Sequence, residues 1–165
     1  MALHEHIRHS PILSASEAPI RMIGAFAESV GQATDLTQVG ECILRILSEQ
    51  LRLPKAAIWI REANGEYHLL ASLGHRTLAA LPASLPDNHA LITGLSDRLH
   101  LLRYDQASSS PVGSAMISIQ AAVCLPLRNK TQFLGLCALG PIGTECHLDE
   151  DTVIIAETVA RIACN

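Results

Sequence analysis

The stretch that decides the fold runs from Ala121 to Pro141 and reads AAVCLPLRNKTQFLGLCALGP. Two short apolar runs, Ala122–Leu127 and Phe133–Leu139, are separated by a polar break from Arg128 to Gln132. Apolar runs of this length that are bounded by turn residues are typical of buried strands, and a break of this length suits a hairpin. The sequence therefore predicts a β-hairpin over these residues.

Two residues in this hairpin carry positional information. Gly135 lies inside the second run, where a missing side chain usually marks a close approach by another backbone. Pro126 has no backbone N–H to donate, which indicates a bulge or an edge position in the first strand. Downstream, Leu148–Ala163 carries apolar residues at helical spacing. The predicted unit is a hairpin, a loop and a helix.

The residues before the hairpin predict two helices and further strands. Asp35 and Gln38 stand in capping-box positions at the start of the second helix. A short helix that ends at Leu95, a flexible serine-rich segment at 108–113 and a helix at Ser114–Ile119 are expected before the hairpin. The other predicted elements are helices at Glu17–Val30 and Leu36–Leu51, and strands at Ala56–Ile60, Tyr67–Ser72 and Leu99–Tyr104.

The composition is that of one globular domain with an aliphatic core. The 165 residues are 48% hydrophobic, 17% charged and only 3% aromatic. A net charge of −4 without a basic run gives no electrostatic footprint for nucleic acid. No segment approaches the ~20 apolar residues of a membrane span, and the N-terminus lacks the apolar core of a signal peptide. We therefore expect a cytoplasmic protein, with no membrane insertion by this segment.

Residues 1–16 have no hydrophobic period and are expected to form a flexible N-terminal arm before a single domain at 17–165. The arm contains His4, His6 and His9, but no cysteine or carboxylate cluster completes a metal-ligand set, so no metal site is predicted. An odd number of cysteines without a Cys-x-x-Cys pair favours reduced thiols. The cysteines are Cys42, Cys124, Cys137, Cys146 and Cys164.

The hairpin and the helix after it resemble the GAF family of small regulatory domains. The matching pieces are the Leu-Pro-Leu of Leu125–Leu127, a polar turn, the Leu-Gly-Leu-x-Ala-Leu of Leu134–Leu139 and the acidic helix start at Asp149–Asp151. With the upstream helix and strand, the resemblance covers roughly Glu17 to Cys164. It implies an α/β (α+β) fold: a central antiparallel sheet of five to six strands, terminal helices on one face, and capping loops and short helices on the other.

The same resemblance implies a function: a non-catalytic sensory or regulatory domain of a larger signal-transduction protein, covalently linked to an output domain. The resemblance places a ligand pocket between one sheet face and the capping segment Gly74–Ile119, where polar residues gather. An aliphatic pocket with few polar groups would suit a small apolar or mixed ligand, or no ligand at all. The cofactor is left open. The expected pocket residues are Trp59, His75, His89, Arg103, Tyr104, Cys124 and Cys137.

Other uses of a GAF scaffold find weaker support in the residues. The free methionine-R-sulfoxide reductases need an exposed, activated thiolate and a resolving cysteine. Cys124 and Cys137 lie inside predicted strands, where they pack in the core or face each other across the hairpin. Cyclic-nucleotide-binding members share only Asp151 with this chain around the final helix. The stretch that carries the bilin-linking cysteine in other members, Ser108–Ile119, has none here.

Both terminal helices carry apolar residues at heptad-like spacing, which favours a homodimer that forms through these helices. A second stripe of small residues, Val153, Ala156, Ala160 and Ala163, runs beside the first on the last helix. The alternative is a single wide face turned to the core. The residues expected in the dimer contact are Ile20, Ile23, Ala27, Val30, Ile155, Val159 and Ile162.

Overall fold

One antiparallel sheet with the strand order β3-β2-β1-β6-β5-β4 organises the computed structural model, which describes residues 17–75, 81–143 and 149–165. The strands are β1 Lys55–Arg61, β2 Tyr67–Leu73, β3 Ser84–Leu85, β4 Leu102–Arg103, β5 Val123–Arg128 and β6 Phe133–Gly140. The helices are α1 Glu17–Gln32, α2 Leu36–Leu51, α3 Ala90–Leu95, α4 Tyr104–Ala107, α5 Pro111–Ser118 and α6 Glu150–Ala163. The predicted arm at 1–16, and with it His4, His6 and His9, lies outside the described residues, as does Cys146.

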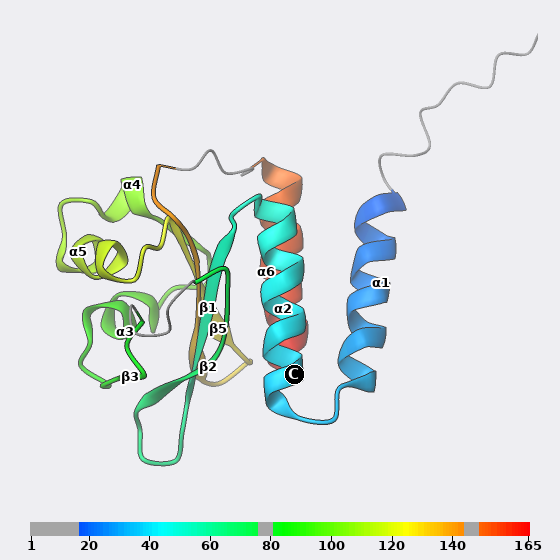
Figure 1. Ribbon diagram of the computed structural model, residues 1–165, viewed down its shortest axis with the longest axis horizontal. Helices are drawn as coiled ribbons and strands as arrows, with labels where there is room; N and C mark the ends of the chain where they lie inside the picture. The colour runs from blue at the N-terminus through cyan, green and yellow to red at the C-terminus, as the bar shows by residue number, and fades with distance from the viewer. Residues whose placement is uncertain (1–16, 76–80, 144–148) are drawn as a thin grey trace, which may run out of the picture.

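Helices cover both faces of the sheet, as the resemblance to GAF domains implies (Figure 1). The terminal helices α2 and α6 lie against one face, with α1 packed on their outer side, and α3, α4 and α5 lie over the other face. Side chains on each strand point alternately to the two layers, because the pleat has a period of two residues. Ala56 and Ile58 of β1 therefore join the helical layer, whereas Ala57 and Trp59 join the cap layer.

The hairpin of β5 and β6 forms in the predicted place, with Leu125 opposite Cys137. A methyl group on Gly135 would overlap the carbonyl oxygen of Trp59 in the neighbouring strand, which confirms the predicted close backbone approach. Pro126 lies in a stretch of β5 that β4 does not reach, since β4 pairs only with Val123 and Cys124. A residue without an N–H is tolerated on such an edge.

The side chain of Asn129 holds the turn between these two strands. Its Oδ1 accepts hydrogen bonds from the backbone N–H of Thr131 at 3.0 Å and of Gln132 at 2.8 Å. We expect Asn129→Ala to lower the free energy of unfolding by about 1 kcal/mol, because the turn loses its internal acceptor. Urea denaturation measures this cost. Lys130→Ala is the matched control, since Lys130 is exposed; an equal cost at both positions would contradict the role of Asn129.

The helical layer encloses the first of two buried clusters. Asp35 caps α2 by accepting a hydrogen bond from the Gln38 N–H at 2.8 Å, and Asp149 caps α6 in the same way through Thr152 at 2.8 Å. Phe26 is fully buried between α1 and the rest of this layer, a core residue that the predicted α1 face does not contain. The helical boundaries therefore follow the sequence closely, but the α1 core face does not.

The predicted dimer seam on the last helix is wrong. Ile155 is 7% exposed and Val159 is 0% exposed, and Ile162 packs partly buried against the same cluster. Ala156 and Ala160, from the neighbouring stripe, are buried as well. The two stripes together form one wide face turned to the sheet and to α2, which is the alternative that the spacing left open.

On α1 the predicted contact residues divide between two environments. Ile20 and Ala27 are exposed, whereas Ile23 and Val30 are half-buried. Val30 packs against the helical cluster beside Phe26 and Met22. Only Ile20 and Ala27, out of the predicted set, remain on a free surface of the described residues.

Two predictions for the cap layer also need correction. The third strand is limited to Leu102 and Arg103, because α4 begins at Tyr104 and turns the chain away from β5. The serine-rich segment is not simply flexible: the Ser110 hydroxyl accepts a hydrogen bond from the Gly113 N–H at 3.3 Å and caps α5. Pro111 follows in the first turn, where the helix needs no N–H from it.

Candidate functional site

The face of the sheet under the cap, where the ligand pocket is expected, is filled by a second buried cluster. Trp59, Leu136 and Cys124 rise from the three central strands and are all 0% exposed. They meet side chains from α3 and α5, including Leu91, Leu95 and Met116. Over the described residues, the central space between sheet and cap is therefore occupied by the protein's own apolar and aromatic side chains.

Trp59 of β1 connects the sheet to the loop at Pro82 by a hydrogen bond. Its indole Nε1–H donates a hydrogen bond to the backbone carbonyl of Pro82 at 2.9 Å. A buried indole needs such an acceptor, because an unpaired N–H in an apolar cluster is costly. The position of Trp59, predicted in the pocket, is thus in the cap core, where it contributes packing and one fixed hydrogen bond.

The polar residues predicted for the pocket perform local structural roles. The Nδ1 of His89 accepts a hydrogen bond from the Leu91 N–H at 3.3 Å and so caps α3. Arg103 is exposed and forms an ion pair with Asp105 at 2.9 Å. Tyr104 packs half-buried against the cap cluster, and His75 follows the end of β2. None of the four lines the opening in the cap face described below.

Burial sets the protonation of the two histidines. Burial is the larger cause, and the nearby positive charge of Lys55 the smaller one, that lowers the pKa of His75 below its ordinary value. Burial alone lowers the pKa of His89. A lowered pKa keeps both rings neutral at pH 7, and a neutral His89 ring retains the lone pair that accepts the Leu91 N–H.

Cys124 and Cys137 do not face each other. Cys124 belongs to the cap cluster and Cys137 to the helical cluster, so the two thiols lie on opposite faces of the sheet. Burial raises the pKa of the Cys124 thiol to about 12 and raises that of Cys137 strongly as well. Both thiols stay protonated at neutral pH, and a protonated, buried thiol is a poor nucleophile.

An opening of about 440 Å³ lies at the edge of the cap face, between α3 and the two hairpin ends. The rings of Tyr67 and Phe133 form one wall, with their centroids 5.6 Å apart. Arg61 and Asp87 bring charges of opposite sign to the same opening. Burial raises the pKa of Tyr67; Arg61 opposes this effect and Asp87 adds to it, so both charges lie close to the phenol. Aromatic rings next to one positive and one negative side chain suit a small ligand of mixed polarity.

Sequence reasoning missed the residues around this opening. The four named above come from separate segments: Arg61 from the end of β1, Tyr67 from the start of β2, Asp87 from the loop before α3 and Phe133 from the start of β6. The sheet register places Arg61 opposite Tyr67, and Phe133 begins the strand on the other side of β1. Their shared signal in the sequence is that three of them flank predicted hairpin turns.

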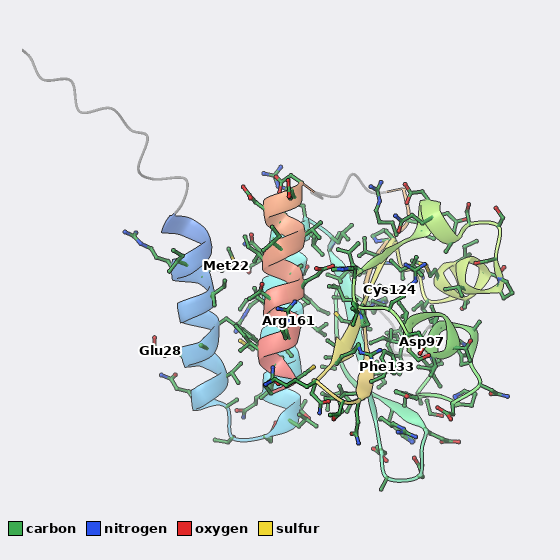
Figure 2. All side chains as sticks on the ribbon, turned by 180° about the vertical axis from the view of Figure 1, so that it is seen from behind. Met22, Glu28, Asp97, Cys124, Phe133 and Arg161 are labelled. Carbon is green, nitrogen blue, oxygen red and sulfur yellow. The ribbon has the colours of Figure 1, made fainter. Side chains whose placement is uncertain are left out.

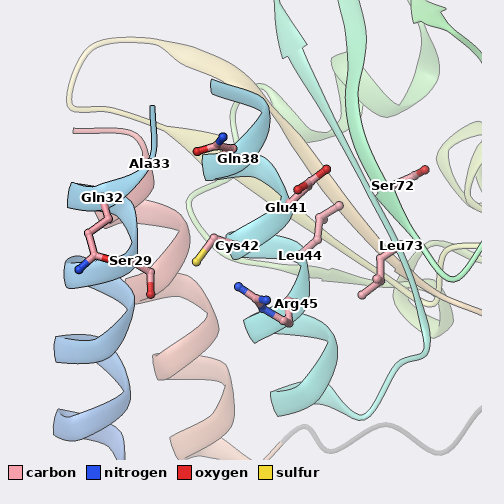
Figure 3. Close-up of a pocket in the computed structure, with 10 residues that line it drawn as sticks. All are labelled: Ser29, Gln32, Ala33, Gln38, Glu41, Cys42, Leu44, Arg45, Ser72 and Leu73. Atoms are coloured by element: carbon pink, nitrogen blue, oxygen red, sulfur yellow. The ribbon is translucent and has the colours of Figure 1, made fainter. Parts of the chain in front are cut away.

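A second groove, of about 560 Å³, runs along α2 between α1 and β2 (Figure 3). Figure 3 shows Cys42 on the side of α2 turned to α1, whereas Leu44 lies on the side turned to β2. Because α2 separates these two sides, the polar residues of the groove do not converge on one point. The described residues also contain no group of three or more His, Cys, Asp or Glu side chains that could hold a metal ion.

Solved structures with the same architecture identify the fold. The GAF domain of an Acinetobacter phosphoenolpyruvate-protein phosphotransferase superposes with a TM-score of 0.71 at 12% identity, over 92% of this chain and 92% of that one. The corresponding domain from Coxiella burnetii gives 0.69 at 19% identity, over 91% and 93%. This chain has the GAF fold. The chromophore-binding domain of a Stigmatella aurantiaca bacteriophytochrome gives 0.66 at 13% identity, over 97% of this chain.

The chain spans 62% of the length of that phytochrome domain. No protein-family model matches its sequence, and no curated protein matches it either. At these identities the superpositions establish the fold alone. Among the described helices, none is both long and apolar enough to cross a membrane.

Proposed function

We propose that the chain is a non-catalytic sensory or regulatory domain of a larger signal-transduction protein. The observation that carries this proposal is the cap face of the sheet. A cluster of apolar side chains fills the space under the cap, and an opening lined by polar and aromatic residues lies at its edge. A site of this kind suits binding more than chemistry, because no nucleophile with an adjacent base lies at the opening among the described residues. Structures of similar fold come from a chemotaxis protein and a putative sensor histidine kinase, which supports a sensory role.

The ligand in this proposal is a small molecule that carries both a ring and polar groups. It stacks on the Tyr67 and Phe133 rings and pairs with Arg61 and Asp87. Binding there draws α3 and the two hairpin ends together, since all three contribute to the opening. The cap cluster beneath it contacts every central strand, so a shift of α3 is passed to the sheet.

The two terminal helices offer the route by which a signal leaves the domain. Figure 1 shows α1 and α6 running in the same direction on the same side of the sheet, with the start of α1 at one end and the end of α6 at the other. A module that precedes α1 and an output domain that follows α6 would then be attached at opposite ends of these helices. This arrangement supports the proposed covalent link to an output domain.

A homodimer is part of the proposal, through a different surface from the buried α6 seam. Exposed residues of α1 recur at 4-3-4 spacing with no charge among them. Ile20 is 70% exposed, and a Cβ built on Gly24 or Gly31 would meet nothing within 4 Å. Small residues allow two helices to approach closely. The surface, called here the α1 stripe, consists of Ile20, Gly24, Ala27 and Gly31.

The buried, unpaired thiols distinguish this proposal from a thiol enzyme on the same scaffold. We expect native protein at pH 8 to react with iodoacetamide at Cys124 and Cys137 far more slowly than urea-unfolded protein, because burial holds both thiols protonated. Peptide mass spectrometry measures the labelling. In parallel, we expect no turnover of free methionine-R-sulfoxide. Turnover that is lost in Cys124→Ser would contradict the non-catalytic assignment. A reduced state of these thiols also accords with the proposed cytoplasmic location.

A further inference from the structure

A third hollow lies on the helical side of the β5–β6 hairpin, away from the cap opening. It has a volume of about 400 Å³, within the range of roughly 300–1,000 Å³ that is usual for small-molecule sites. Its floor is apolar and buried, and is formed by Leu125 and Pro126 of β5 and by Ala160 of α6. The exposed side chain of Leu99 adds to the apolar wall.

Three cationic side chains surround this floor: Arg128, Lys130 and Arg161. Arg128 ends β5, Lys130 lies in the turn after it, and Arg161 comes from the last turn of α6, where Figure 2 labels it. Within residues 17–75, 81–143 and 149–165, none of the three forms an ion pair with a carboxylate. Such a concentration of unpaired positive charge stands out in a chain whose net charge is −4.

Glu157, whose side chain is the one carboxylate side chain among the residues that line the hollow, is already engaged. Glu157 accepts a hydrogen bond from the Leu101 N–H at 3.0 Å and lies 3.1 Å from Nδ1 of His100. Its side chain is only 15% exposed, whereas Lys130 and Arg161 are exposed. Among the acidic and basic side chains of Asp, Glu, Lys and Arg that line the hollow, three are positive and one is negative.

Arg128 lines the hollow, and its side chain is held in place by one hydrogen bond. Its Nη1 donates a hydrogen bond to the backbone carbonyl of Ser96 at the end of α3. The remaining N–H groups of the guanidinium can still donate, and their planar arrangement matches a carboxylate or phosphate group. A stabilising effect of Arg161 on the α6 dipole explains one cation at this place, but it does not explain why three converge over an apolar floor.

We propose that this hollow binds a small organic anion with an apolar body, the anionic group being a carboxylate or a phosphate. The apolar body lies on Leu125, Pro126 and Ala160, and the anionic group is bound by the three cations. The site is separate from the cap opening and does not depend on a ligand there. It joins the hairpin, the 99–101 loop and the last turn of α6, so a bound anion fixes the helix end that leads out of the domain.

Titration calorimetry with four probes tests the proposal: octanoate, phenyl phosphate, octanol and acetate. We expect saturable binding of octanoate, phenyl phosphate or both, which distinguishes a carboxylate from a phosphate site. If octanoate binds, its affinity should be at least about tenfold higher than that of octanol, which lacks the charge, and than that of acetate, which lacks the apolar body. Lys130→Gln and Arg161→Gln should each lower the affinity for the anion that binds by about tenfold. Arg45→Gln, an exposed cation on α2, is the control and should change nothing.

Amide chemical shifts distinguish this site from the cap opening, because a probe in the hollow should perturb Lys130 and Arg161 and leave Arg61 and Asp87 unchanged. The proposal is overturned if neither anion saturates by about 10 mM. It is also overturned if octanol binds as well as octanoate, or if Arg45→Gln weakens binding as much as Arg161→Gln. Shifts confined to the cap opening would assign the anion to that opening and would likewise end the proposal.

Discussion

Ile155→Glu should leave the protein unfolded at room temperature, whereas Ile154→Glu should leave it folded. Ile155 is 7% exposed and lies in the helical cluster beside Val159, but its neighbour Ile154 is 54% exposed. Burial of an unpaired carboxylate costs several kcal/mol, and small domains are stable by only about 5–15 kcal/mol. Thermal unfolding followed by circular dichroism compares the two variants with the wild type.

These neighbouring substitutions separate two interpretations of the α6 apolar face. If Ile155→Glu left the protein folded but monomeric, this result would support the dimer contact that the heptad-like spacing predicts. Equal destabilisation by both variants would mean that the buried face of α6 has been assigned wrongly. The control is closely matched, because the two isoleucines share one helix and the same substitution.

Leu136→Ala should lower the free energy of unfolding by about 2–5 kcal/mol, the usual cost of removing a large aliphatic side chain from a packed core. Leu136 is 0% exposed and lies in the cap cluster, on the central strand β6. Leu134 is the matched control, because it lies two residues away on the same strand but is only half-buried, at a shallow surface hollow. We expect Leu134→Ala to cost less than half as much.

Urea denaturation of both leucine variants tests where the buried part of β6 begins. The sequence predicts burial of Leu134, Leu136 and Leu139 alike, and the structure confirms this for Leu136 and Leu139. Leu134 differs because it lies where β6 extends beyond the cap, near the β1–β2 turn. An equal loss at Leu134 and Leu136 would mean that the cap extends further along the strand than the structure indicates.

Local signals account for the parts of the fold that the sequence predicted well. The β5–β6 hairpin follows from its polar break, since Asn129 supplies the hydrogen bonds of the turn from within the break itself. Helix α2 follows from its cap at Asp35, and its bounds agree with the prediction. Gly135 was informative because a strand interior offers few other reasons for a missing side chain. In each case the deciding contact joins residues close in the chain or in adjacent strands.

The candidate site was poorly predicted because its contacts are long-range. Loop residues with polar side chains were expected to converge on a ligand, but His89 caps its own helix and Arg103 pairs with nearby Asp105. The opening is instead formed by residues such as Tyr67 and Phe133, which only the strand order brings together. The α6 seam failed for another reason: apolar spacing is the same whether a helix faces its own core or a partner.

Sedimentation velocity at micromolar concentration, applied to the wild type, Ala27→Glu and Ala25→Glu, tests the proposed regulatory dimer most directly. Ala27 lies in the α1 stripe, whereas Ala25 is exposed on the same helix outside it. The wild type and Ala25→Glu should sediment as dimers, and Ala27→Glu as a folded monomer, because two glutamates would face each other across the helix pair. A monomeric wild type, or a dimer that persists in Ala27→Glu, would contradict the proposed signalling surface.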